Sequence, residues 1–120
     1  MLDDERMLLD MYKIGFEKRG YEVHACYDAD DALNVLRQGL QPDVILFDIT
    51  MPDSRSGYEF IETVKKERLA KHALKIALTN EGSDGAINRA EELGADGHLL
   101  KAKYIPSELA AVVTELLSKR

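Results

Sequence analysis

The feature that most constrains this chain is the stretch Asp43–Gly57, DVILFDITMPDSRSG, in which four consecutive apolar residues lead into Asp48. A strand with one face in water alternates apolar and polar residues. The unbroken run Val44–Phe47 therefore predicts a strand buried on both faces, as in a parallel sheet covered by helices. A chain of 120 residues is the size of one such domain, so we expect a single α/β domain over residues 1–120.

Strand and helix patterns alternate along the rest of the chain. Strands are predicted at 21–27, 43–47, 75–79 and 97–101. Helices are predicted at 4–19, from Asp28 to near Gly39, at about 58–67, at Asp84–Leu93, and from Pro106 onward. The predicted core-facing residues of these helices include Met7, Leu8, Met11, Ile14, Leu33, Leu36, Leu109, Val112, Val113, Leu116 and Leu117. Such alternation predicts parallel pairing, right-handed crossovers and helices on both faces.

Polar residues stand where the predicted strands end. Asp48, Thr79 and Lys101 each close a strand, and Asp3 and Asp4 stand just before the first helix, where a preceding strand would end. In open parallel sheets, ligands bind beyond the carboxyl ends of the strands. We therefore expect these five side chains to share one rim of the sheet.

An acidic rim of this kind needs a cation. Two carboxylates about 4 Å apart repel by roughly 1 kcal/mol in water and about 4 kcal/mol at an effective dielectric constant of 20. An all-oxygen site with room for water suits Mg²⁺ or Mn²⁺. The expected ligands are Asp4 and Asp48 directly, the backbone carbonyl of Thr50, and Asp3 through a water molecule.

Lys101 and Thr79 are expected on the other side of Asp48, where they supply an ammonium and a hydroxyl donor. A metal ion, an ammonium and a hydroxyl around one carboxylate are the groups needed to hold a phosphoryl group during and after transfer. A carboxylate can also act as the nucleophile, which would give an acyl phosphate on Asp48.

Four segments together resemble one known family. They are DD (3–4), LFDITMP (46–52), ALT (77–79) and GADGHLLK (94–101). In this order, and at these separations, the chain resembles the receiver domain of two-component response regulators over nearly its whole length. The resemblance implies a flavodoxin-like (CheY-like) three-layer sandwich with strand order 2-1-3-4-5. It also implies that Asp48 is the phosphoacceptor, that Asp3 and Asp4 help bind Mg²⁺, and that Thr79 and Lys101 contact the phosphoryl group.

The function implied by this resemblance is a signalling switch and not an enzyme. A sensor histidine kinase or phosphotransfer protein would donate a phosphoryl group from phosphohistidine, and the face around the fourth helix and last strands would change its affinity for a downstream protein. His98 stands where the family often has an aromatic switch residue. Two alternatives remain open: an interaction module that has lost phosphorylation, and a phosphohydrolase of the haloacid dehalogenase type. The latter expects a second aspartate where Thr50 stands.

The chain departs from the family before its acidic pair, where only Met1 and Leu2 precede Asp3. The family has a whole hydrophobic strand there. Losing about four doubly buried side chains forfeits roughly 6–12 kcal/mol, against a typical net stability of about 5–15 kcal/mol. The expectation is that the first strand is truncated in this sequence, that a partner chain supplies it, or that two copies exchange elements in a homodimer. We favour the dimer.

Composition excludes several functions. The net charge is −6, with 22 acidic and 16 basic residues, which argues against non-specific binding of nucleic acid or of an anionic membrane. The single cysteine, Cys26, can form neither an internal disulfide nor a structural zinc site, so a reducing cytoplasm is the expected location. The sequence has no apolar run of about 18 residues and no signal-peptide pattern at Met1.

Overall fold

The computed structural model describes residues 1–49, 51, 56–80 and 84–120. Three parallel strands form one sheet in the order β1-β2-β3, with β1 at Val44–Asp48, β2 at Leu74–Thr79 and β3 at Gly97–Leu100. The register pairs Asp48 with Leu78 and Thr79 with Leu100. The α/β class expected from the sequence is confirmed.

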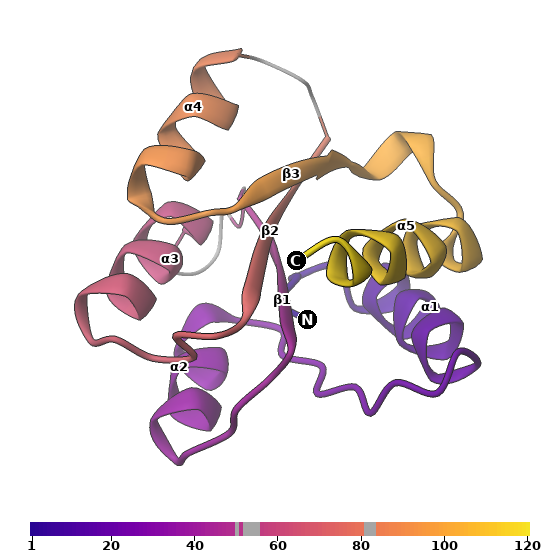
Figure 1. The fold of residues 1–120 in the computed structure, drawn as a ribbon, viewed down its shortest axis with the longest axis horizontal. Coiled ribbons are helices and arrows are strands. Elements are labelled where there is room, and N and C mark those ends of the chain that lie inside the picture. The colour runs from indigo at the N-terminus through magenta and orange to yellow at the C-terminus, as the bar shows by residue number, and fades with distance from the viewer. Residues whose placement is uncertain (50, 52–55, 81–83) are drawn as a thin grey trace.

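Helices cover both faces of the sheet. The described residues form α1 (Arg6–Glu17), α2 (Ala29–Arg37), α3 (Gly57–Lys66), α4 (Asp84–Leu93) and α5 (Pro106–Ser118). In Figure 1, α2, α3 and α4 lie on one side of the strands, and α1 and α5 lie on the other. A short 3₁₀ turn, η1 (Lys101–Lys103), follows β3. The result is three layers, as expected.

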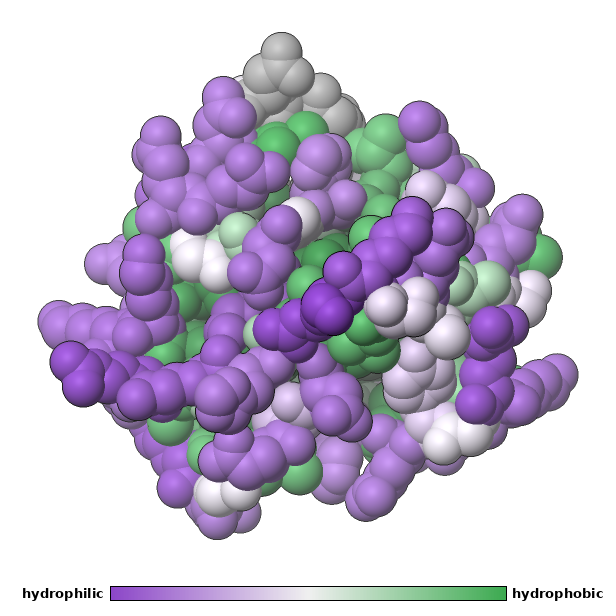
Figure 2. All heavy atoms as spheres, viewed as in Figure 1, coloured by the Kyte–Doolittle hydropathy of each residue, from purple (hydrophilic) through white to green (hydrophobic). Residues whose placement is uncertain are grey.

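Two hydrophobic clusters fill the spaces on either side of the sheet, beneath an outer surface that Figure 2 shows to be largely hydrophilic on the face in view. Ile45 and Phe47 belong to the cluster under α2 and α3, whereas Leu46 belongs to the cluster under α1 and α5. All three side chains are buried. Successive residues of a strand point to opposite faces, so β1 needs apolar residues at consecutive positions. This confirms the sequence-based interpretation of Val44–Phe47.

The N-terminal residues lie in the sheet beside β1. Leu2 is 1% exposed and forms isolated parallel bridges with Phe47 and with Cys26. Its amide donates to the Leu46 carbonyl at 2.8 Å, and its carbonyl accepts from the Asp48 amide at 2.9 Å. One buried leucine thus ties the start of the chain to the end of β1.

The predicted strand at 21–27 is wrong in extent. Among these residues only Cys26 forms a bridge: its amide donates to the Met1 carbonyl at 2.8 Å, and its carbonyl accepts from the Asp3 amide at 3.1 Å. A strand requires a neighbour with which to exchange backbone hydrogen bonds. Met1–Asp3 reach only the end of this segment, so the preceding residues are not assigned to a strand.

The predicted core face of the first helix is also wrong. Met7, Met11 and Ile14 are exposed at 83%, 52% and 55%. The buried positions of α1 instead are Leu9, Tyr12, Gly15 and Phe16. Both sets have helical spacing, and the set with the two aromatic rings buries the larger apolar surface. Sequence periodicity alone did not distinguish the two faces.

Most other elements agree with the sequence. Asp28 caps α2 by accepting a hydrogen bond from the Asp31 amide at 2.8 Å, and α4 has the predicted bounds. The expected inward residues Leu33, Leu36, Leu109 and Val113 are buried. Among the described residues, no helix has the length and apolarity that a membrane crossing requires.

Gly57 brings the start of α3 against the end of β1. Its amide donates to the Ile49 carbonyl at 3.0 Å, and a Cβ at this position would overlap the Asp48 carbonyl oxygen. We expect Gly57→Ala to lower the free energy of unfolding by about 1–3 kcal/mol or more, because the backbone must shift to relieve the overlap.

Urea denaturation monitored by circular dichroism measures this change, and Gly85→Ala is the matched control. Gly85 lies in α4, and a Cβ added there would have no neighbouring atom within 4 Å. Alanine there should stabilise the protein by up to about 1 kcal/mol, because alanine favours helix more than glycine does. Equal destabilisation by both substitutions would contradict the close contact at Gly57.

Candidate functional site

The strand register brings three predicted site residues to one edge of the sheet. Asp48 ends β1 opposite Leu78, Thr79 is the next residue of β2, and Lys101 follows Leu100, the partner of Thr79. Asp48, Thr79 and Lys101 therefore lie in order across three neighbouring strands, each at the carboxyl end of its strand and one residue beyond the register partner of the residue before it. Asp48, Thr79 and Lys101 are all buried, at 2%, 5% and 6% exposure.

The acidic pair reaches this edge through Leu2. Because Leu2 pairs with β1, the following residue, Asp3, lies beside the end of that strand and is 1% exposed. Carboxylate oxygens of Asp3, Asp4 and Asp48 all lie within 4.8 Å of one another. The structure thus brings together three acidic residues that come from two distant parts of the sequence. Asp4 is the most accessible of the three.

The Lys101 ammonium lies between two of these carboxylates. Its Nζ donates to Asp3 Oδ2 at 2.6 Å and lies 3.2 Å from Asp48 Oδ2. The sequence led us to expect Lys101 only on the far side of Asp48 from the acidic pair. The contact with Asp3 corrects that expectation: Lys101 partly neutralises the same carboxylates that would bind a cation.

Burial and charge act in opposite directions on Lys101. Burial by itself lowers the pKa of the ammonium, but the hydrogen bond with Asp3 and the charges of Asp48 and Asp3 raise it further, so the net pKa lies above its ordinary value of 10.5. The lysine is therefore fully charged at neutral pH. Two buried carboxylates beside one ammonium leave an excess negative charge at this site.

That excess charge and the oxygen donors fit a small hard cation. Two oxygens on one Mg²⁺ at 2.0–2.1 Å are separated by at most about 4.2 Å. Carboxylates within 4.8 Å of one another therefore need only a small shift, or one bridging water, to share an ion. Thr50, whose carbonyl was a predicted ligand, lies outside the described residues.

Other residues near the site were missed by sequence reasoning. Asp3 also accepts a hydrogen bond from the Glu5 amide at 3.0 Å, which orients its carboxylate. Burial raises the pKa of Tyr12, whose ring on α1 is within electrostatic reach of Lys101 and Asp3. Tyr12 has the spacing of one helical face with Leu9 and Phe16, and this spacing could have predicted that its side chain is buried. His98, which the sequence analysis did name, lies near the start of β3, away from Lys101, with its Nδ1 4.0 Å from Glu91 Oε1.

Comparison with known proteins identifies the fold and the family that this site resembles. The model of the response regulator receiver domain family matches residues 1–114. A CheY-like receiver domain protein from Methanospirillum hungatei is 30% identical, with a TM-score of 0.84 over 98% of this chain and 90% of that chain. The chemotaxis response regulator CheY4 of Vibrio cholerae is 29% identical, with a TM-score of 0.84 over 96% of this chain and 93% of that chain.

A third similar structure is the BeF3-activated receiver domain of DrrB, a protein from Thermotoga maritima. It is 27% identical to this chain, and the match covers 99% of this chain and 94% of that chain with a TM-score of 0.79. All three matches span nearly the whole of both chains.

The Lys101 contacts predict a strong stability effect. Lys101→Met leaves Asp3 and Asp48 buried without their common counter-charge, so we expect a loss of about 3–5 kcal/mol in the free energy of unfolding without divalent metal. Added Mg²⁺ should stabilise this variant more than the wild type, because the ion replaces the missing charge. Chemical denaturation with and without Mg²⁺ measures both effects.

Lys103→Met is the control, since Lys103 is exposed on the same 3₁₀ turn. A similar loss in both variants would show that the buried ion pairs contribute little.

The raised pKa of Lys101 also makes the difference in free energy of unfolding between the wild type and Lys101→Met depend on pH. Above neutral pH, this stabilisation should stay complete up to about pH 10.5 and should disappear as pH rises through the folded-state pKa of Lys101, so the wild type should lose its advantage over Lys101→Met in strong alkali.

Proposed function

The chain belongs to the response regulator receiver domain family, and from this membership we propose that Asp48 accepts a phosphoryl group from a phosphohistidine donor in the presence of Mg²⁺. Two-component signalling is the context of this family, which implies a histidine kinase as partner, and its receiver domains are generally signalling modules rather than true enzymes. The observation that carries the proposal is the group of Asp3, Asp4 and Asp48 around the end of β1, with Lys101 in contact.

The transfer step uses Asp48 as the nucleophile. One carboxylate oxygen of Asp48 attacks phosphorus, the bond between phosphorus and the donor imidazole nitrogen breaks, and the electron pair returns to the imidazole. The product is an acyl phosphate on Asp48. Later attack by water on phosphorus releases inorganic phosphate and restores the carboxylate.

The other residues position the reacting groups. Asp3, Asp4, Asp48 and the Thr50 carbonyl are the proposed ligands of Mg²⁺, which would neutralise charge on the phosphoryl oxygens. Lys101, held by Asp3 and Asp48 in the free protein, would turn to a phosphoryl oxygen once Asp48 carries the phosphoryl group. Thr79, one residue past the partner of Asp48, would donate its hydroxyl to another oxygen.

We also propose the full strand order 2-1-3-4-5, with residues 1–120 as one receiver domain. Leu2 bridges Cys26 on one side and Phe47 of β1 on the other, which supports placing Met1–Asp3 between segment 21–26 and β1. Met1–Asp3 would then belong to the central strand of that order. Output would pass to a downstream protein through the face formed by α4, β3 and α5, where His98 is exposed.

Intact-mass spectrometry tests the phosphoacceptor directly. Incubation with a small acyl-phosphate donor and Mg²⁺ should add the mass of one phosphoryl group to the wild type and nothing to Asp48→Asn. Asp43→Asn is the matched control, because Asp43 is exposed at the other end of the same strand segment and should label normally. Chelation of the metal should abolish labelling.

Two results would reject this proposal. Equal labelling of Asp48→Asn and wild type would place the phosphoryl group elsewhere. No labelling of a folded, Mg²⁺-saturated wild type would favour the alternative, an interaction module that keeps the fold without phosphorylation. A Mg²⁺ titration of the unlabelled wild type then shows whether the protein fails to bind the metal or binds it and fails to accept the phosphoryl group.

A further inference from the structure

A groove with a basic lining lies at the rim of the sheet opposite the acidic site. It runs between the C-terminal ends of α3 and α4, which lie side by side in Figure 1, and it has a volume of about 400 Å³. Lys75 of the groove and Thr79 of the acidic rim are four residues apart on β2, which is roughly 13 Å along a strand. The charged residues that line the groove are Lys65, Arg68, Lys71, Lys75, Glu91 and Asp96.

Positive charge is concentrated beside this groove in a chain that is acidic overall. Segment 65–75 carries five of the 16 basic residues and only one acidic residue, Glu67. The Glu67 carboxylate is already bound by the Arg37 guanidinium, whose Nε and Nη2 donate to its two oxygens at 2.8 and 2.6 Å. With a net charge of −6 for the whole chain, the groove is a local reversal of the overall sign.

The two carboxylates of the groove have partners of their own. Asp96 Oδ2 accepts a hydrogen bond from the Lys75 amide at 2.8 Å, and Glu91 Oε1 lies 4.0 Å from His98 Nδ1. The Lys75 ammonium in turn donates to the Ala73 carbonyl at 3.1 Å. These contacts leave the other three cations of the groove without a carboxylate to neutralise them.

Those three cations are Lys65, Arg68 and Lys71. All three are exposed, and their side chains make no hydrogen bond or ion pair within the part of the chain that the structure describes. A cation in the last turn of a helix stabilises the helix dipole, which accounts for Lys65. It does not account for Arg68 and Lys71, which lie beyond the end of α3.

Arg68 stands at a backbone position that favours glycine. Its φ is +57°, in the left-handed region, where a side chain crowds the backbone. The Arg68 amide donates to the Lys65 carbonyl at 3.2 Å and the Leu69 amide donates to the Val64 carbonyl at 2.9 Å, which is the Schellman end of a helix. The same pair of hydrogen bonds ends α1, α2 and α4, and there the left-handed residues are Gly20, Gly39 and Gly94.

The arginine is therefore unfavourable for the end of α3, although its charge lines the groove. Glycine would satisfy the same two hydrogen bonds without a side chain in the left-handed region. A guanidinium at this place gives the groove a planar fork that matches two oxygens of a phosphate. The backbone and the charge thus point separately to an anion as the ligand.

The size of the groove selects a small anion over a polymer. Ligand pockets typically measure about 300–1,000 Å³, and this groove falls within that range. Duplex nucleic acid or an anionic membrane would extend beyond the groove onto a surface of the opposite sign, which would repel it. A compact anion with several charges can contact the three free cations and nothing else.

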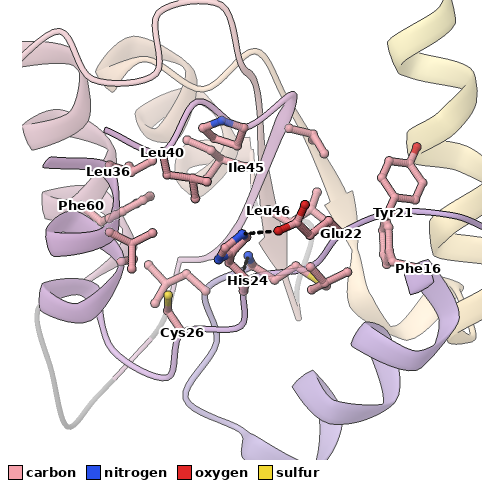
Figure 3. Close-up of a pocket in the computed structure, with 17 residues that line it drawn as sticks. Phe16, Tyr21, Glu22, His24, Cys26, Leu36, Leu40, Ile45, Leu46 and Phe60 are labelled. Atoms are coloured by element: carbon pink, nitrogen blue, oxygen red, sulfur yellow. Dashed lines mark hydrogen bonds and ion pairs between the residues drawn. The ribbon is translucent and has the colours of Figure 1, made fainter. Parts of the chain in front are cut away.

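The pocket beside β1 has a different character. Figure 3 shows it lined by Leu36, Phe60 and other apolar side chains, with Glu22 and His24 at its edge. Glu22 Oε1 lies 3.4 Å from His24 Nε2. The described residues that line this pocket include no lysine or arginine, so its side chains are not suited to a multiply charged anion.

We propose that the basic groove binds a small oligophosphate, a linear chain of two or three phosphates that is either free or carried by a nucleoside. Arg68 contacts one phosphate with its guanidinium fork, and Lys65 and Lys71 contact the neighbouring phosphates as point charges. This inference goes beyond the proposed phosphoacceptor function, because neither Asp48 nor Mg²⁺ takes part in it.

Isothermal titration calorimetry of the full chain with inorganic triphosphate tests the proposal. EDTA is present, so that no divalent ion can hold phosphate at the acidic rim. We expect one triphosphate to bind per chain at a physiological salt concentration of about 0.15 M, and more weakly as salt screens the exposed charges. ATP should bind at least as tightly as triphosphate. Equal affinity for orthophosphate would mean an adventitious ion only and would overturn the proposal.

Arg68→Gly separates a binding role from a structural one. Triphosphate affinity should fall roughly tenfold or more, because a charge-assisted bidentate contact is lost. The melting temperature should stay the same or rise, because glycine suits the left-handed position, whereas an arginine that only supported the fold would lower it when removed. Arg68→Lys should keep part of the affinity, and Lys71→Gln should reduce affinity without a change of backbone.

Lys66→Gln is the matched control. Lys66 is exposed in the same last turn of α3 but does not line the groove, so this variant should bind triphosphate like the wild type. The proposal is overturned if Arg68→Gly binds as tightly as the wild type, or if Lys66→Gln loses as much affinity as Arg68→Gly. It is also overturned if the folded wild type does not bind triphosphate, or if a glutamate-rich peptide binds more tightly than triphosphate.

Discussion

The pairing of Leu2 with β1 is the interaction on which both the fold and the site depend. Hydrogen bonds on its two sides join Met1–Asp3 to Cys26 and to the end of β1, and the buried side chain closes the cluster under α2 and α3. Burial of one leucine contributes about 1.5–3 kcal/mol, a sizeable part of the net stability of a small domain. The same pairing sets the place of Asp3, so the arrangement of the three carboxylates of Asp3, Asp4 and Asp48 depends on it.

The charges at the site oppose the stability that this pairing provides. Asp3, Asp48 and Lys101 are all buried, and desolvation of a buried ion pair often cancels its Coulomb attraction. Replacing all three together by hydrophobic groups of similar size would cost the fold little or would stabilise it, whereas replacing one alone leaves the others buried without a counter-charge. Their presence at one edge of the sheet, where parallel pairing fixes the backbone geometry, does not follow from stability and agrees with the function proposed above, in which they would hold a cation and a phosphoryl group.

The sequence predicted the elements whose signals depend on their own residues. The consecutive apolar residues Val44–Phe47 predicted β1, and the capping residue Asp28 predicted the start of α2. Because the carboxyl ends of parallel strands lie at one edge of a sheet, the common location of Asp48, Thr79 and Lys101 could also be predicted. Predictions failed where the outcome depends on a neighbour. Segment 21–25 was predicted as a strand, but it has no adjoining strand among the described residues. Helix α1 has two apolar faces, and the one that packs inward is not the predicted one. The contact between Lys101 and Asp3 joins opposite ends of the chain, which local sequence patterns do not report.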